Sequence, residues 1–224
     1  MKENLIKGWK LARYGLNFKL QLVFMIVFFV LGTVATIETE NTIGVLDIGT
    51  VFLLCTAMFP AQMLLSLDIT ELAQTSPYKK KIQTDMPALI TVAGTYLMFI
   101  WNLILLAVSC GIRGISYADM SWRILLVGIW AVIILLFNGF CYKHFILSLV
   151  ALYMVAFGGG FAVGIGQMVG KIGNISLNPV LSILISTVLI LILIGGALEY
   201  ALTLLFYKQP LSKMAFGALA KKNL

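Results

Sequence analysis

The sequence predicts an all-α integral membrane protein with six transmembrane helices and an N-terminal amphipathic helix at the membrane interface, with both termini in the cytoplasm. The first observation behind this class is composition. Hydrophobic residues are 61% of the 224 residues and charged residues are 11%, whereas soluble domains carry about 45–50% and about 25%. The mean hydropathy of +1.01 excludes a soluble domain, and the wealth of aliphatic and aromatic residues excludes disorder.

The second observation is a set of long stretches that contain no Asp, Glu, Lys or Arg. A spanning helix needs about 20 mostly apolar residues, because the hydrocarbon core is ~30 Å thick and each residue rises ~1.5 Å. Six stretches meet that length. We therefore expect one transmembrane domain over residues 1–224, with spans over about 20–37, 48–67, 86–108, 124–142, 144–163 and 184–206.

The third observation is the uneven placement of Lys and Arg. With both termini on one side, that side carries thirteen of these residues, and the other carries three, Arg113, Arg123 and Lys171. Basic residues favour the cytoplasmic side of a membrane, so both termini are expected inside. The net charge of +7 then reflects topology and lipid headgroups. The cations are split among four segments, which disfavours nucleic-acid binding.

Residues 2–19 precede the first span and alternate basic and apolar residues with a helical period. Four residues fall at spacings of 4, 3 and 4 and so share one face: Leu5, Trp9, Ala12 and Leu16. This pattern predicts an amphipathic helix in the cytoplasmic headgroup layer, with Trp9 as the anchor. A basic tail without a fixed helix is the alternative.

The second span and the loop after it contain two notable features. Pro60 removes a backbone donor and predicts a kink. Residues 66–85 form the one substantial cytoplasmic loop, in which Ser76 can cap a short cationic helix with Pro77 in its first turn. This loop is either a topology signal or a docking element, and its central residues are Ser76, Pro77, Tyr78, Lys79, Lys80, Lys81 and Ile82.

The fifth span loses its regularity where seven glycines crowd into residues 158–173. So many glycines weaken a continuous helix. We expect the helix to end there and a broken or re-entrant element to follow at the outer face, over about residues 164–180. Irregular backbone survives at membrane depth only where protein or a water-filled cavity covers it.

The last span contains a candidate flexible point at Gly195–Gly196 and a carboxylate, Glu199. A charged residue at the centre of a spanning helix costs roughly 2.5–3.5 kcal/mol on insertion scales. Glu199 is either a water-reachable or hydrogen-bonded residue near the inner interface, or a gate or proton site. Pro60 and these three residues are the candidate gate or hinge residues.

No residues converge in the sequence on catalysis, cofactor binding or metal binding. Cys55, Cys110 and Cys141 lie at different depths and read as packing thiols rather than a disulfide set. His144 is the one histidine, and no metal-ligand spacing surrounds it. The segment from Gly166 to Lys171 lacks the spacing of a phosphate-binding loop. The chain is therefore not expected to be an enzyme.

Six spans, the amphipathic N-terminal helix, the basic loop between the second and third spans and the broken outer element together resemble the permease subunit of the type-2 ABC transporter (ABC-2) family. The stretch Thr75-Ser76-Pro77-Tyr78-Lys79-Lys80-Lys81-Ile82 looks like the loop that opens the third helix in this family. The resemblance implies that residues 2–19 are the connecting helix and that the region from Ser76 to Thr84 is the coupling helix. It also implies short re-entrant helices around Gly164 to Asn178.

The resemblance further implies the assembly and its activity. A separate ATP-binding cassette subunit would bind ATP and Mg²⁺, and two identical or different permease subunits would pair in the plasma membrane, the inner membrane of a bacterium. Such small permeases often export peptides or other amphipathic compounds. Two other classes remain: an ATP-independent secondary transporter or channel that uses Glu199, and a membrane scaffold or intramembrane enzyme.

Overall fold

The structure of the chain is a computed structural model. It describes residues 10–11, 13–14, 18–38, 48–66, 77–113, 117–141, 143–158, 180–209 and 212. Helices are the regular elements in this part of the chain, and they are α2 (Phe18–Glu38), α3 (Ile48–Thr56), α4 (Phe59–Ser66), α6 (Lys79–Gln83), α7 (Asp85–Arg113), α8 (Tyr117–Cys141), α9 (Phe145–Tyr153), a π-helical turn (Met154–Gly158) and α11 (Leu181–Phe206).

Five helical segments of the described chain are long and apolar enough to cross a membrane. They are Phe18–Glu38, Ile48–Ser66, Lys79–Ile112, Met120–Cys141 and Leu181–Phe206. The prediction of an all-α fold with long apolar helices is therefore confirmed for the described residues, and these helices suggest a membrane protein. The six-span count and the orientation stay predictions. The predicted fifth span, 144–163, is described only as far as Gly158, as α9 and the π-helical turn.

Two further predictions lie outside the described residues. The four residues of the amphipathic face, Leu5, Trp9, Ala12 and Leu16, are not described, and neither is the outer segment 164–180 except for Val180. The connecting helix and the re-entrant element therefore stay predictions.

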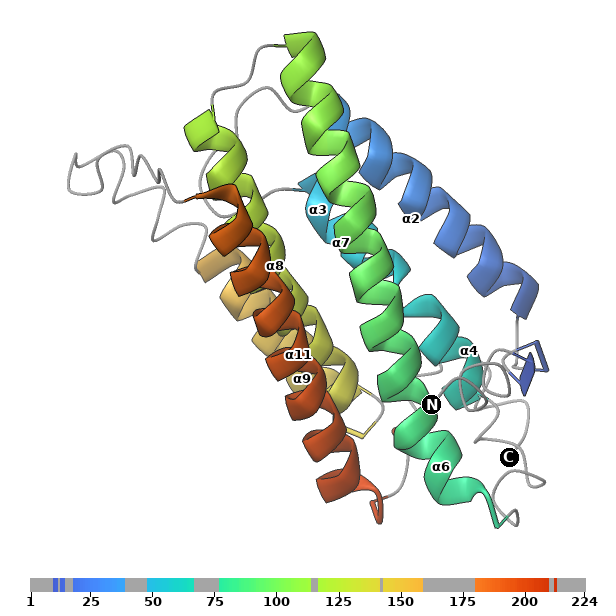
Figure 1. The fold of residues 1–224 in the computed structure, drawn as a ribbon. Helices are drawn as coiled ribbons and strands as arrows, with labels where there is room; N and C mark the ends of the chain where they lie inside the picture. Colours follow the sequence, from blue (N-terminus) through green and yellow to red (C-terminus); the bar gives the residue numbers. More distant parts are fainter. Residues whose placement is uncertain are drawn as a thin grey trace.

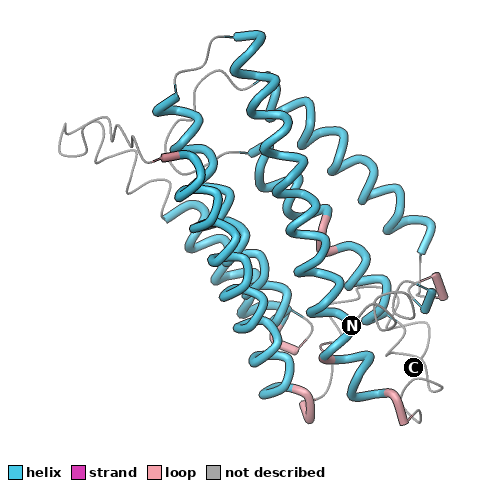
Figure 2. The backbone as a smooth tube through the Cα atoms, viewed as in Figure 1, coloured by secondary structure: helices cyan, strands magenta, loops and turns pink. Residues whose placement is uncertain are grey.

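The long helices run side by side along the molecule (Figure 1, Figure 2). Helix α11 packs against α8 along most of its length and also contacts α7, while α2 packs against α3 at one edge of the bundle. Helix α6 lies just before the first turn of α7. The consequence is that α7, α8 and α11 enclose a common interior.

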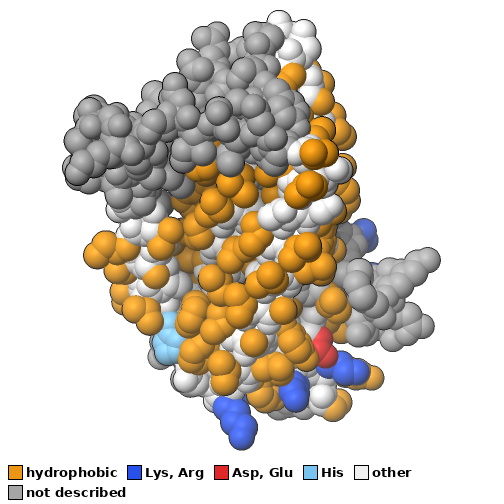
Figure 3. Space-filling view, turned by 60° about the vertical axis from the view of Figure 1, so that its left-hand side comes forward, with side chains coloured by type: hydrophobic (Ala, Val, Ile, Leu, Met, Phe, Trp, Pro, Cys, Tyr) orange, Lys and Arg blue, Asp and Glu red, His pale blue; other side chains and the backbone are white. Residues whose placement is uncertain are grey.

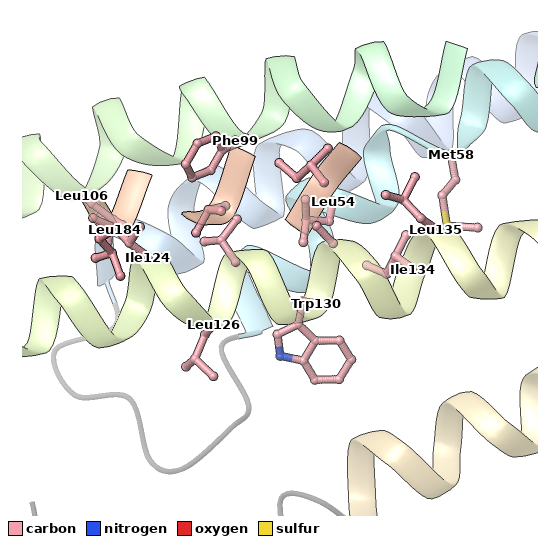
Figure 4. Close-up of a cluster of buried hydrophobic side chains, with 14 residues drawn as sticks. Leu54, Met58, Phe99, Leu106, Ile124, Leu126, Trp130, Ile134, Leu135 and Leu184 are labelled. Carbon is pink, nitrogen blue, oxygen red and sulfur yellow. The ribbon is translucent and has the colours of Figure 1, made fainter. Parts of the chain in front are cut away.

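Apolar side chains fill this interior. The main cluster joins α3, α7, α8 and α11, and Leu54, Phe99 and Leu135 lie between these helices, while the buried Trp130 projects from the opposite side of α8 (Figure 4). A second, smaller cluster joins α4, α6 and α7. Apolar side chains also cover the outside of the helices (Figure 3), as expected where lipid replaces water as the solvent.

The second predicted span is broken into α3 and α4 by a turn at Ala57–Met58. The backbone N–H groups of these two residues bond three residues back, Ala57 to Leu54 O at 3.1 Å and Met58 to Cys55 O at 3.0 Å. Pro60 has no N–H to offer the carbonyl of Thr56, and its ring clashes with that carbonyl in a regular helix. The break therefore lies in the turn just before the proline.

Helix α11 is continuous through Gly195–Gly196, where the sequence suggested a flexible point. Both glycines are buried, and a Cβ added at Gly195 would lie 2.9 Å from Leu135 Cδ1. A Cβ at Gly196 would clash with Val92 Cγ2. The two glycines thus allow α11 to approach α7 and α8 closely, and flexing at this point stays a prediction.

Described lysines gather at one end of the bundle, which we call the lysine end. It is defined by Lys79, Lys80 and Lys81 in α6, Lys143 after α8 and Lys208 after α11, and Figure 3 shows basic side chains toward that end. Arg123, in α8, is 1% exposed and lies in the half of the helix away from the lysine end.

Candidate functional site

Helix α6 is the basic element that the sequence singled out for docking. It begins at Lys79, with Tyr78 as its N-cap residue and no side-chain cap, and it ends at Gln83. The helix thus starts later than a cap at Ser76 would place it, because Pro77 and Tyr78 form a turn instead. Pro77 and Tyr78 are exposed, and Ser76 lies outside the described residues.

One side of α6 is fixed to the bundle and the other is free for contact with solvent. Ile82 is 6% exposed and packs with Met63, Leu64, Met86 and Ile90. Lys80 and Lys81 are exposed, and Lys79 is half-buried. The result is a short cationic helix that is held by one apolar anchor.

Thr84 joins α6 to α7 rigidly. Its Oγ1 lies 2.7 Å from Lys80 O and 2.9 Å from Asp85 Oδ1, and its one hydroxyl hydrogen can be donated to either acceptor. The backbone N–H of Thr84 donates to Lys80 O as well, at 3.0 Å. These contacts connect the end of α6 to the first turn of α7.

Lys143 connects α6 to the end of α11. Its Nζ donates to Gln209 O at 2.6 Å and to Gln83 Oε1 at 3.5 Å. Since Lys143 follows α8 directly, this one side chain links the ends of α6, α8 and α11. The link lies at the lysine end, beside the docking residues.

A buried polar cluster lies deeper in the bundle, among α7, α8 and α11. Asn138 Nδ2 donates to Thr91 Oγ1 at 3.0 Å and also to Glu199 Oε1. The exposed fractions are 0% for Thr91, 1% for Asn138 and 0% for Glu199. Three side chains from three helices therefore meet at one depth, and none of them faces lipid.

This cluster leaves two buried oxygen atoms without a hydrogen-bond partner, Asn138 Oδ1 and Glu199 Oε2. Buried polar groups normally find partners, so two such atoms in one cluster need an explanation. A cavity of about 20 Å³ lies beside Asn138, toward the lysine end, and Gln83, Lys143 and Thr203 are among its lining residues. That volume is enough for one water molecule.

A groove of about 360 Å³ also runs between α7 and α11. Its lining is mostly apolar and includes Val92 and Gly196, and Asp85 and Tyr200 contribute the polar groups. The groove passes over the same part of α11 as the Glu199 cluster, because Gly196 and Tyr200 flank that residue in the sequence.

Sequence reasoning singled out Glu199 but missed its partners. Nothing in the sequence indicated that Thr91 and Asn138 meet Glu199 inside the bundle, as they do in the structure. Thr91 lies in the second turn of α7, and Asn138 lies in the last turn of α8. Counting turns from the helix ends nearest the lysines would have placed these polar residues near the depth of Glu199.

A second polar contact joins α3 to α7, where Asn102 Nδ2 donates to Thr50 Oγ1 at 3.2 Å. In the described part of the chain, no group of three His, Cys, Asp or Glu residues could hold a metal ion. None of the three cysteines, all of which the structure describes, forms a disulfide, and Cys141 is buried. Comparisons with family models, with curated proteins and with solved structures found no match to this chain.

Proposed function

We propose that the chain is the transmembrane permease subunit of an ATP-driven exporter, powered by a separate ATP-binding cassette subunit. The observation that carries this proposal is α6. A cationic helix of five residues presents Lys80 and Lys81 outward at the end of an apolar bundle. The cationic face suits an acidic protein surface, since complementary charge steers and orients docking.

The connections of α6 support a role in transmitting motion. Ile82 anchors the helix, Thr84 fixes it to α7, and Lys143 links it to the ends of α8 and α11. When a partner binds ATP and moves α6, the three long helices that enclose the polar cluster would move with it. Rigid-body shifts of packed helices are a common way to switch a transporter between states. Under this proposal, the substrate is a peptide or another amphipathic compound. ATP and Mg²⁺ would be bound by the partner subunit.

The test is charge reversal on α6 with a matched control elsewhere. K80E/K81E should abolish binding of the ATPase subunit and the ATPase activity that depends on this chain. K10E/K19E changes the charge equally at two exposed lysines that are not part of the lysine end and should retain most of the activity. Both variants should insert into membranes to the same extent as the wild type.

The measurement is co-purification of a nucleotide-binding subunit, followed by ATPase assays in reconstituted vesicles. If both double variants lose binding of the ATPase subunit and ATPase activity to the same extent, the effect comes from net charge alone, and docking through α6 is refuted. Transport by the purified chain alone would also refute the proposal.

A second candidate is an ATP-independent secondary transporter or channel that uses Glu199. The buried cluster of Thr91, Asn138 and Glu199 favours it, because ionisable residues inside spanning segments often mark ion or proton pathways. This candidate predicts transport by the purified chain in vesicles without ATP, and loss of that transport in E199Q.

A further inference from the structure

We propose that Glu199 carries a proton on Oε2 and forms an acid–amide pair with Asn138, so that α8 and α11 together make a proton-binding site. The pair would have two hydrogen bonds. Asn138 Nδ2 donates to Glu199 Oε1 in the structure, and the protonated Oε2 would donate to Asn138 Oδ1. This inference goes beyond the proposed export function and does not depend on it.

The orientation of the Asn138 amide is the first step of the argument. Thr91 Oγ1 donates its hydrogen to Pro87 O at 2.9 Å, and in this arrangement its oxygen accepts from Asn138. The amide then presents Nδ2 to Thr91, at 3.0 Å. The second hydrogen of Nδ2 then points to Glu199 Oε1, and Oδ1 is the remaining atom of the amide.

The two atoms left without a partner are complementary. They are Asn138 Oδ1, which accepts, and Glu199 Oε2, which donates only when it is protonated. An ionised Glu199 would be an acceptor only, and both atoms would then be buried without a donor. A single proton on Oε2 supplies the missing donor and satisfies both atoms at once.

Among the described residues, no Lys or Arg side chain supplies the missing donor in place of a proton. Glu199 forms no ion pair with them, and an unpaired buried carboxylate is strongly unfavourable. The helices packed against Glu199 carry other ionisable residues, which are Asp85, Tyr96, Cys110 and Arg113 on α7, Tyr117, Asp119, Arg123 and Cys141 on α8, and Tyr200 on α11.

The basic side chains nearest in the chain are occupied or distant. Lys143 Nζ donates to Gln209 O at 2.6 Å. Arg123 is on α8 about four helical turns from Asn138. Neither is hydrogen-bonded to Glu199.

The small cavity beside Asn138 indicates the direction of access. It lies between Asn138 and the lysine end, where Gln83 and Lys143 line it. The lining is mostly apolar, but Asn138, Gln83, Lys143 and Thr203 contribute polar groups, and the cavity has room for one water molecule. We therefore place proton access on the side of the lysine end.

Infrared spectroscopy of the purified full-length chain in lipid nanodiscs tests the proposal. The difference spectrum between wild type and E199Q at neutral pH should contain the carbonyl band of a protonated carboxylic acid, shifted in D₂O. Labelling with dicyclohexylcarbodiimide, which reacts with protonated carboxyls in apolar surroundings, should modify Glu199 of the wild type and fall as the pH is raised. Mass spectrometry locates the adduct.

Thermal unfolding tests whether Glu199 and Asn138 form the two-bond pair or whether each stabilises the bundle independently of the other. E199Q should keep the wild-type midpoint, because its amide donates to Asn138 Oδ1 as the protonated acid would. N138L should lower the midpoint, and E199Q/N138L should be no better than N138L. A carboxylate band with no acid band, or carbodiimide labelling that Na⁺ suppresses at constant pH, would overturn the proposal. Labelling of the wild type decides the question even if a variant fails to fold.

Discussion

The crossing of α2 and α3 is close enough for one methyl group to disrupt it. A Cβ at Gly49 would lie 2.5 Å from Thr36 Oγ1 and 2.6 Å from Thr36 N. On the other side of the crossing, a Cβ at Gly32 would lie 2.9 Å from Leu53 N. Close approach at small residues is a common way for helices to associate in membranes. G49A should therefore separate the two helices.

The size of the effect follows from what must move. Thr36 N is a backbone atom, so no side-chain rotation relieves the clash, and α2 must shift as a whole. Overpacking of this kind typically destabilises by about 1–3 kcal/mol, and we expect the upper half of that range. Alanine also gains up to about 1 kcal/mol over glycine as a helix former, which offsets part of the loss.

Gly111 offers the matched control. It lies in α7, and a Cβ there would meet nothing within 4 Å. G111A has the same change in helix propensity without the clash, so the propensity contribution largely cancels in the comparison. G49A should be less stable than G111A by about 2–3 kcal/mol.

The assay is reversible unfolding of the purified protein in mixed micelles, followed by tryptophan fluorescence. A pair of spin labels on the exposed faces of α2 and α3 reports the separation of these two helices directly. If G49A and G111A unfold at the same denaturant mole fraction and the label distance is unchanged, the reasoning about backbone contact is refuted.

The other two predictions concern the lysine end and the broken span. K143M removes the donor to Gln209 O and Gln83 Oε1. We expect the free energy of unfolding to fall by at most about 1 kcal/mol, while amide hydrogen exchange becomes faster in α6 and at the end of α11. Equal acceleration of exchange throughout the bundle would contradict the link. P60A restores an N–H for the carbonyl of Thr56 and removes a helix-breaking penalty of up to about 3 kcal/mol. Spin labels at the two ends of residues 48–66 should then lie farther apart, as in a straighter helix. An unchanged distance between the labels would show that the proline does not cause the break.

The sequence predicts the helices of this protein well because hydropathy and charge measure depth along the membrane normal. The charge-free run 20–37 corresponds to α2, which extends over Phe18–Glu38, and the last predicted span, 184–206, corresponds to Leu181–Phe206. A break near Pro60 also follows from local chemistry, since the missing N–H is a property of that residue alone.

The sequence could not predict how each helix is rotated about its own axis, and therefore which of its faces contacts the neighbouring helices. Glu199 was recognised as unusual, but its pairing with Asn138 depends on which faces of α8 and α11 meet. Gly195–Gly196 suggested flexibility because glycine weakens isolated helices. In the structure these glycines are buried against Leu135 and Val92, and contacts between helices that are far apart in the sequence decide that role.

The length of α7 makes the chain sensitive to the thickness of its bilayer. Its 29 residues rise about 44 Å, which exceeds the ~30 Å of a typical hydrocarbon core. A helix with this excess tilts, and a thinner or thicker bilayer changes the tilt at a modest energetic cost. Because Thr84 connects α6 to the first turn of α7, we expect the acyl-chain length of the surrounding lipids to change the height of the cationic helix relative to the membrane surface.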